Sequence, residues 1–99
     1  MIVLTNARAT ASAPRSFEIE KGDEREIAPG ITLGISDIDP VARRVYGWIW
    51  LKGDGRSLIV RAQPAFSPLV FYQGGSRREL RFTGLSTDSA VGRLTVSAN

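Results

Sequence analysis

Apolar residues in this chain recur in short runs in which every second position is apolar. The clearest alternation lies in residues 15–20, where Phe17 and Ile19 are separated by polar residues, and in residues 31–36. A period of two residues places successive side chains on opposite faces of a β-strand. No window of helical length shows the 3.6-residue spacing of an α-helix, so the pattern predicts an all-β chain.

Glycine, proline and aspartate cluster between these runs and divide the chain into strands. The one helix-like segment is residues 39–44, where Asp39 suits the N-cap and Pro40 the first position of at most one helical turn. Phe66, in a proline-rich link, is expected to fill an edge of the core. We expect strands at residues 2–5, 15–20, 25–27, 31–36, 45–51, 56–62, 69–72, 77–83 and 90–97.

Short strands separated by turns throughout 99 residues are typical of a single β-sandwich or small barrel. We predict a small antiparallel β-sandwich of jelly-roll type, formed by residues 15–99. Residues 6–14 are small and without pattern, so residues 1–14 are interpreted as a first strand and an extended N-terminal arm. A chain of this size buries a modest core and here has no cysteine for disulfides, so a partner subunit is the expected extra support.

The chain contains neither histidine nor cysteine, which excludes the commonest general base, the thiol nucleophile and the soft metal ligands. The Gly-x-Ser-x-Gly, P-loop and dinucleotide-binding motifs are also missing. Asp37 and Asp39 could bind calcium together with Asp54 or Asp88, but the spacing lacks further ligands, so a turn and a helix cap are preferred. We therefore expect no enzyme activity, no cofactor and no metal.

The most distinctive segment is the aromatic run at residues 46–50. Counting back from a four-residue turn at 52–55 gives the register of a hairpin. One face of this hairpin carries the cross-strand pairs Trp50/Ser57, Trp48/Ile59 and Tyr46/Arg61. The other face carries the pairs Leu51/Arg56, Ile49/Leu58 and Gly47/Val60.

These two faces leave two arrangements open, because water cannot cover both. If the aliphatic face lies in the core, the face with Tyr46, Trp48 and Trp50 is a large apolar patch that the arm, another subunit or a ligand must cover. If the tryptophans form the core instead, the aliphatic face lies under the arm. The alternation of apolar residues along the two strands fits both arrangements, so it does not choose between them.

The charge is unevenly distributed along the chain. The formal net charge is +3, but residues 1–40 carry four basic and seven acidic side chains, whereas residues 41–99 carry nine basic and three acidic ones. A chain with one acidic and one basic half attracts copies of itself as readily as it attracts phosphate.

The main basic concentration is Arg77, Arg78 and Arg81, close to Tyr72. Alternation along a strand places Arg77 and Arg81 on one face with Glu79 between them, and Arg78 on the other face with Leu80 and Phe82. Because Glu79 interrupts the charge, a solvated strand edge or one half of a subunit contact is preferred over a phosphate-binding face.

The preferred function is a non-catalytic assembly module that binds itself, with a ring such as a trimer as a natural result, or that decorates a larger protein assembly such as a virion. The alternatives are a single-strand nucleic-acid binder that stacks bases on Tyr46, Trp48, Trp50 and Tyr72, and a carbohydrate-binding module that uses the same tryptophans with Asp37, Asp39 or Asp54. The residues expected at the contacts are Glu18, Glu20, Glu26, Tyr46, Trp48, Trp50, Arg61, Tyr72, Arg77, Arg78 and Arg81.

The expected location follows from the lack of targeting segments. Residues 1–5 are apolar but too short for the core of a signal peptide, and no stretch approaches the ~18 apolar residues of a membrane span. We expect the protein in the cytoplasm, or in a virion, without a membrane partner.

Overall fold

The computed structural model describes residues 15–96, which form strands and turns without any helix. The predicted strands between residues 15 and 97 are all present, with bounds shifted by at most a few residues. The predicted strand at 2–5 and the arm at 1–14 lie outside the described residues. The strands are β1 (Arg15–Glu20), β2 (Glu24–Ala28), β3 (Ile31–Asp39), β4 (Arg44–Leu51), β5 (Arg56–Pro64), β6 (Leu69–Gln73), β7 (Ser76–Leu85) and β8 (Ser89–Val96).

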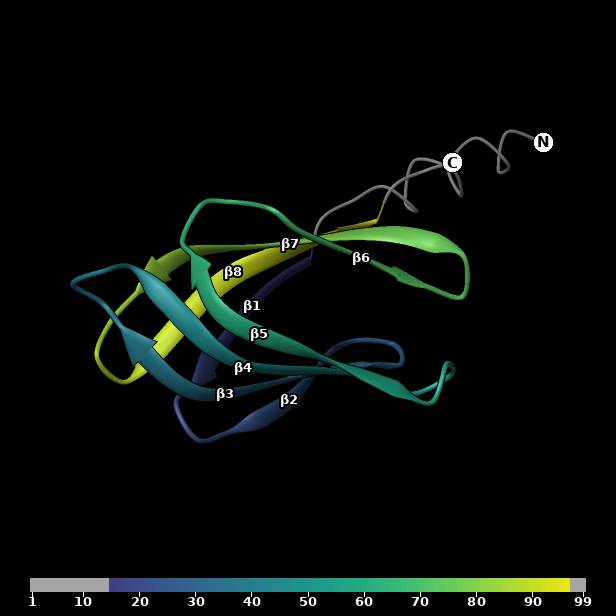
Figure 1. The fold of residues 1–99 in the computed structure, drawn as a ribbon, viewed down its shortest axis with the longest axis horizontal. Coiled ribbons are helices and arrows are strands. Elements are labelled where there is room, and N and C mark those ends of the chain that lie inside the picture. The colour runs from purple at the N-terminus through teal and green to yellow at the C-terminus, as the bar shows by residue number, and fades with distance from the viewer. Residues whose placement is uncertain (1–14, 97–99) are drawn as a thin grey trace.

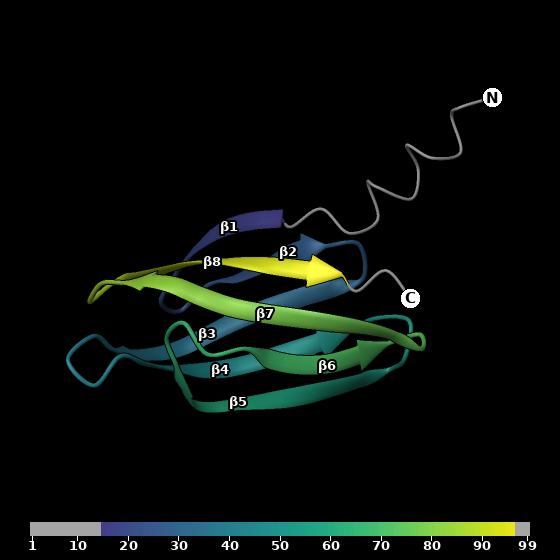
Figure 2. The same cartoon turned by 90° about the horizontal axis from the view of Figure 1, so that it is seen from above.

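The strands form two four-stranded antiparallel sheets. Sheet A has the order β1-β8-β7-β6, and sheet B has the order β2-β3-β4-β5. Figures 1 and 2 show the sheets as two layers facing each other in a sandwich-like arrangement. Within each sheet, neighbouring strands are consecutive in the chain, except for the β1–β8 pair. This order does not confirm the predicted jelly-roll topology, because two Greek keys place non-consecutive strands side by side.

The core is the apolar layer between the two sheets. Sheet B contributes Leu33, Ile49 and Leu51, and sheet A contributes Leu80 and Phe82, all of them fully buried. Phe82 also packs edge to face against Phe17 of β1, with the ring centroids 6.0 Å apart. No polar or charged residue of the described strands and turns is fully buried, so the core is entirely apolar.

Residues 40–43 form a turn and not the helical turn expected after Asp39. The Asp39 carboxylate accepts the backbone N–H groups of Val41, at 3.1 Å, and Ala42, at 3.0 Å. This is the cap expected of Asp39, but β4 begins at Arg44 and leaves no room for a helix. Arg43 ends the turn in the left-handed region, with φ at 60°.

Phe66 does not fill the core edge, contrary to the expectation. Its side chain is 57% exposed, and its φ of 68° directs the chain through the β5–β6 loop in a left-handed conformation. Phe71 of β6 is buried in the core instead, and Leu69 is partly buried against the core. The proline-rich link therefore presents an aromatic ring to solvent.

Candidate functional site

The aromatic residues of β4 lie on the outer face of sheet B. Ile49 and Leu51 point into the core and are fully buried, so the alternating Trp48 and Trp50 point outward. The aliphatic face of the hairpin is therefore the core, which decides between the two arrangements that the sequence left open. We call the outward group Tyr46, Trp48, Trp50 and Ile59 the aromatic face.

Antiparallel pairing arranges this face in rows across sheet B. The predicted pairs Trp48/Ile59 and Trp50/Ser57 are both present, and the register is confirmed from the turn as far as Gly47. Tyr46 and Arg61 do not form a pair, because the register shifts between Val45 and Gly47 and leaves two residues of β5 opposite Tyr46. The two full rows are Glu24–Gly34–Trp48–Ile59 and Glu26–Thr32–Trp50–Ser57.

Trp48 lies against the backbone of β3. A Cβ atom on Gly34 would overlap Cε2 and Cζ2 of the Trp48 indole, so the ring packs onto a position that has no side chain. Trp50 is 41% exposed and Ile59 is 71% exposed on the same face. The result is an apolar surface at the centre of sheet B, of the kind that marks an interaction site.

Acidic residues border the aromatic face. Glu24 and Glu26 of β2 occupy the ends of the two rows, and Asp37 of β3 is opposite Tyr46. Arg44 and Arg61 are exposed on the neighbouring strands. The sequence interpretation included Glu26, and it named Asp37 beside the tryptophans only for the carbohydrate-binding alternative. It missed Glu24, although the pairing of two alternating strands would have placed Glu24 beside the tryptophans.

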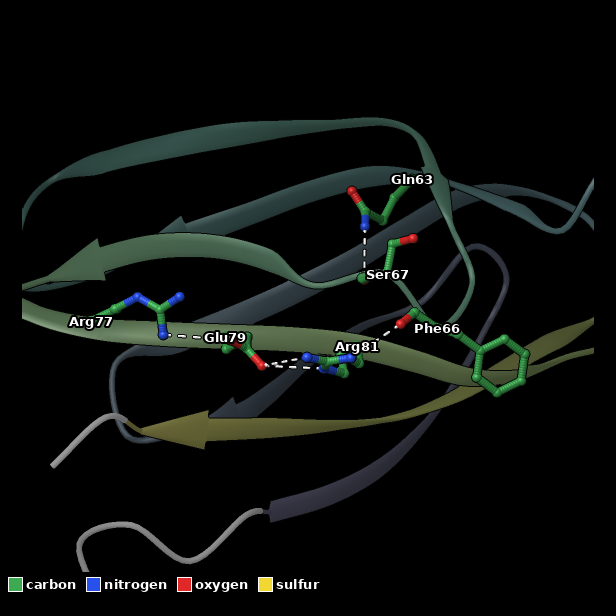
Figure 3. Close-up of polar contacts among 6 residues, drawn as sticks. All are labelled: Gln63, Phe66, Ser67, Arg77, Glu79 and Arg81. Carbon is green, nitrogen blue, oxygen red and sulfur yellow. Dashed lines mark hydrogen bonds and ion pairs between the residues drawn. The ribbon is translucent and has the colours of Figure 1, made fainter.

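The outer face of sheet A carries the predicted arginine pattern. Arg77 and Arg81 point outward on either side of Glu79, whose carboxylate lies 3.4 Å from Nη1 of Arg77 and 3.0 Å from Nη2 of Arg81 (Figure 3). The hydrogen bond from Arg81 is the main cause that lowers the pKa of Glu79, and the charges of both arginines add to it. Tyr72, opposite Arg77, is 53% exposed.

Sheet A also brings two arginines directly opposite each other. Arg81 of β7 pairs with Arg93 of β8, and Arg93 has no ion-pair partner within residues 15–96. Like charges at directly opposite positions destabilise a sheet, and a carboxylate from outside would relieve them. We call Tyr72, Arg77, Arg81 and Arg93 the basic face; the sequence interpretation missed Arg93, which only the β7–β8 pairing reveals.

Arg78 lies apart from the basic face, as its position in the alternation predicts. It shares the inner side of β7 with Leu80 and donates from Nη2 to Oε1 of Gln73, at 2.7 Å. Gln73 in turn donates to the backbone carbonyl of Pro29, at 3.2 Å, and so connects the two sheets. The Nε atom of Arg78 is buried and has no partner among the described residues. Arg78 closes an end of the core and does not take part in an outer surface.

The acidic segment at residues 18–26 is divided between the two sheets. Glu18 and Glu20 alternate with the inward Phe17 and Ile19 on β1, so they belong to the outer side of sheet A. Glu26 belongs to sheet B. The three glutamates therefore do not form one surface, because a turn carries the chain from one layer to the other between them.

The four aromatic residues proposed to stack bases are also divided. Tyr46, Trp48 and Trp50 lie on sheet B, whereas Tyr72 lies on sheet A. A continuous single strand would have to pass around the sandwich to contact all four. The charges on both outer faces are mixed, which removes the basic groove that such binding uses.

The remaining acidic residues make local contacts. Asp54 accepts the backbone N–H of Gly74, at 3.2 Å, and lies 3.9 Å from Nε of Arg56 at the tip of the β4–β5 hairpin. In the part of the chain that the structure describes, no three metal-binding side chains gather around one point. Over the same residues no helix has the length and apolar character needed to cross a bilayer.

Comparisons of the chain with protein-family models, with curated proteins and with solved structures found no match. The candidate functional surfaces are the two outer faces of the sandwich, the aromatic face of sheet B and the basic face of sheet A.

Proposed function

We propose that this protein is a non-catalytic assembly module that binds other copies of itself through the outer faces of its two sheets. The observation that carries the proposal is the outward position of Trp48, Trp50 and Ile59 over a core that is already filled by aliphatic and phenylalanine side chains. Large aromatic side chains at an exposed centre are typical anchors of protein interfaces, where few residues supply most of the binding energy.

The partner is a second copy because the two faces complement each other. The aromatic face has Glu24 and Glu26 at the ends of its rows, and the basic face offers Arg93; none of the three has an ion-pair partner in the described strands, whereas Asp37 already lies 3.8 Å from Nζ of Lys21. Since the faces lie on opposite sides of the sandwich, the contact runs head to tail, which closes into a ring when the rotation permits, with a trimer as one case. The ion pairs steer and orient the contact, and each exposed pair contributes only about 0–1 kcal/mol.

The same aromatic face suits a module that decorates a larger assembly such as a virion. In that setting the face binds a protein of the assembly instead of the next copy. This extension is an analogy with other small all-β modules. Measuring self-association shows whether a partner other than a second copy has to be considered.

The test measures the mass of the full chain in solution for two variants, alone and mixed. Trp50→Thr removes the apolar anchor and keeps a residue suited to a strand. A second variant, Tyr72→Thr with Arg93→Glu, alters the basic face and places a carboxylate opposite Arg81, a pairing of unlike charges that suits the sheet. Lys52→Thr, in the exposed hairpin turn, is the control.

We expect each variant alone to have a smaller mass than the wild type, because each has lost one side of the contact. An equimolar mixture should have a larger mass than either variant alone, because each supplies the face that the other lacks. Recovery of this kind is specific to a head-to-tail contact. If mixing restores nothing, or if the wild type is a monomer at high concentration, the proposal is wrong.

One observation favours a second candidate, a carbohydrate-binding module. The Trp48 ring packs over Gly34 on the outer face of the sheet, where an aromatic ring can serve as a sugar-stacking platform, and Asp37 can accept hydroxyl hydrogen bonds on the same face. Titration with soluble polysaccharides, followed by tryptophan fluorescence, separates this function from self-association.

A further inference from the structure

One end of the sandwich combines three segments that are far apart in the chain. The β3–β4 turn, the β5–β6 loop and the end of β7 lie together there, as Figure 1 shows, and the backbone N–H of Ala65 donates to the carbonyl of Arg43 at 3.0 Å. We call Pro40, Val41, Arg43, Ala65, Phe66, Gly84 and Leu85 the loop end. It belongs to neither the aromatic face nor the basic face.

The loop end contains backbone conformations that side chains disfavour. Arg43, Ala62 and Phe66 are the non-glycine residues with positive φ in the described chain, at 60°, 50° and 68°, and all three lie at this end of the sandwich. Such conformations persist only where the surroundings impose them, and they concentrate at binding sites.

Hydrogen bonds hold Phe66 in place while its ring stays exposed. Its N–H donates to the carbonyl of Phe82 at 2.7 Å, and its carbonyl accepts from Nη1 of Arg81 at 3.2 Å. Gln63 donates to the next carbonyl, that of Ser67, at 3.1 Å (Figure 3). Because these bonds hold the backbone of Phe66, the loop loses little further backbone freedom on binding, which suits Phe66 as an anchor.

A hollow lies beside this anchor on the same surface. Its volume is about 260 Å³, and its lining includes Pro40, Leu85 and Phe66 itself. A cavity of roughly 150 Å³ with apolar walls accepts benzene, so the hollow has room for a phenyl ring. Val41, on the adjacent turn, is 92% exposed and adds an apolar rim.

The charges of the loop end are self-complementary. The turn carries one exposed anion, Asp39, and one exposed cation, Arg43, and Arg43 forms no ion pair with any residue from 15 to 96. A two-fold axis through this end would bring Arg43 of each copy toward Asp39 of the other. It would also bring the guanidinium toward a phenyl ring in the hollow, where a cation–π contact could form.

We propose that the loop end is a two-fold contact between two copies of this chain, in which Phe66 of each copy enters the hollow of the other. A projection and a matching hollow on one surface are what an isologous interface requires. This contact is separate from the head-to-tail contact proposed above, and together the two would pair two rings back to back.

The test compares the mass of the wild type with that of Phe66→Asn by sedimentation or light scattering. Asparagine tolerates the left-handed conformation, so the loop keeps its shape while the ring is removed. We expect the mass to fall to half that of the wild type, and the melting temperature to stay within a few degrees. Lys52→Thr, far from the loop end, is the control and should keep the full mass.

A second variant tests the same contact without removing the ring. Arg43→Asn also suits its left-handed position, and the loss of two cation–π contacts per dimer should raise the dimer dissociation constant roughly tenfold. Equal masses for wild type and Phe66→Asn, or a halved mass for Lys52→Thr, would overturn the proposal. When Phe66→Asn is added to Trp50→Thr, it should still halve the mass. The loop-end contact and the head-to-tail contact can therefore be refuted independently of each other.

Discussion

The two sides of β4 use apolar residues in opposite ways. Its inner side carries Val45, Ile49 and Leu51, which are fully buried between the sheets, whereas its outer side carries Trp48 and Trp50. Tryptophan is among the most effective residues for filling a core, yet this small domain builds its core without either of them. The inner residues of β4 are therefore needed for the fold, whereas its outer tryptophans remain available for binding.

The largest expected effect is on the inner side. Ile49→Ala should lower the free energy of unfolding by about 2–5 kcal/mol, because the truncation leaves a cavity between two packed sheets. Urea denaturation of the full chain measures the change. A loss of less than about 1 kcal/mol in the free energy of unfolding would mean that the inner side of β4 does not lie in the core. The roles of the two sides of β4 would then be exchanged.

A substitution where β3 contacts the outer side of β4 should have an intermediate effect on stability. Gly34→Ala should cost about 1–3 kcal/mol and shift the tryptophan fluorescence, because the new methyl group displaces the Trp48 ring. Gly53→Ala is the matched control, since a Cβ there meets no atom within 4 Å and its φ is not positive. Similar stabilities and spectra for the two variants would show that Trp48 does not pack on Gly34.

Truncation on the outer side should affect stability least among the β4 changes. We expect Trp50→Ala to cost about 1 kcal/mol, since the side chain is half-exposed, while self-association is lost. Thermal melts of dilute protein measure the first effect and light scattering the second. A loss as large as that of Ile49→Ala would assign Trp50 to the fold and not to an interface.

The smallest effect concerns the basic face and depends on pH. The pKa of Glu79 lies below its ordinary value of 4.5 in the folded protein, so its stabilising contribution is present above that value and is lost as the pH falls through the lowered pKa. Glu79→Gln should therefore have a slightly lower urea midpoint than the wild type at neutral pH. In acid, the difference between the two midpoints should become smaller. A difference that grows in acid would contradict this sign.

Local patterns predicted most of the fold. Alternation and turn residues gave the strands between residues 15 and 97, and a four-residue turn gave the Trp48/Ile59 and Trp50/Ser57 pairs. The alternation could not show which side of β4 is buried, because both sides are apolar. That choice depends on how the two sheets face each other, which no single strand records.

The surfaces were harder to predict because they depend on pairing between distant strands. Glu18 and Glu26 separate only when β1 pairs with β8 and β2 with β3. Arg93 joins Arg81 through the β7–β8 pair. The prediction for Phe66 was wrong because a non-glycine residue in the left-handed backbone conformation has no signature in the sequence. Each miss concerns an arrangement that local preferences do not determine.

The most direct test of the central claim uses the two tryptophans as reporters. Trp48 and Trp50 are the only tryptophans in the chain and belong to the same outer face, so tryptophan fluorescence, excited selectively, reports on that face alone. Acrylamide quenching should be efficient in dilute protein and should fall as the concentration rises and copies associate, and Lys52→Thr should behave in the same way. The decisive measurement uses the Phe66→Asn variant, which lacks the loop-end contact. Quenching that stays constant in this variant while its mass increases would show that the copies associate elsewhere, and would contradict the proposal that the aromatic face is the binding surface.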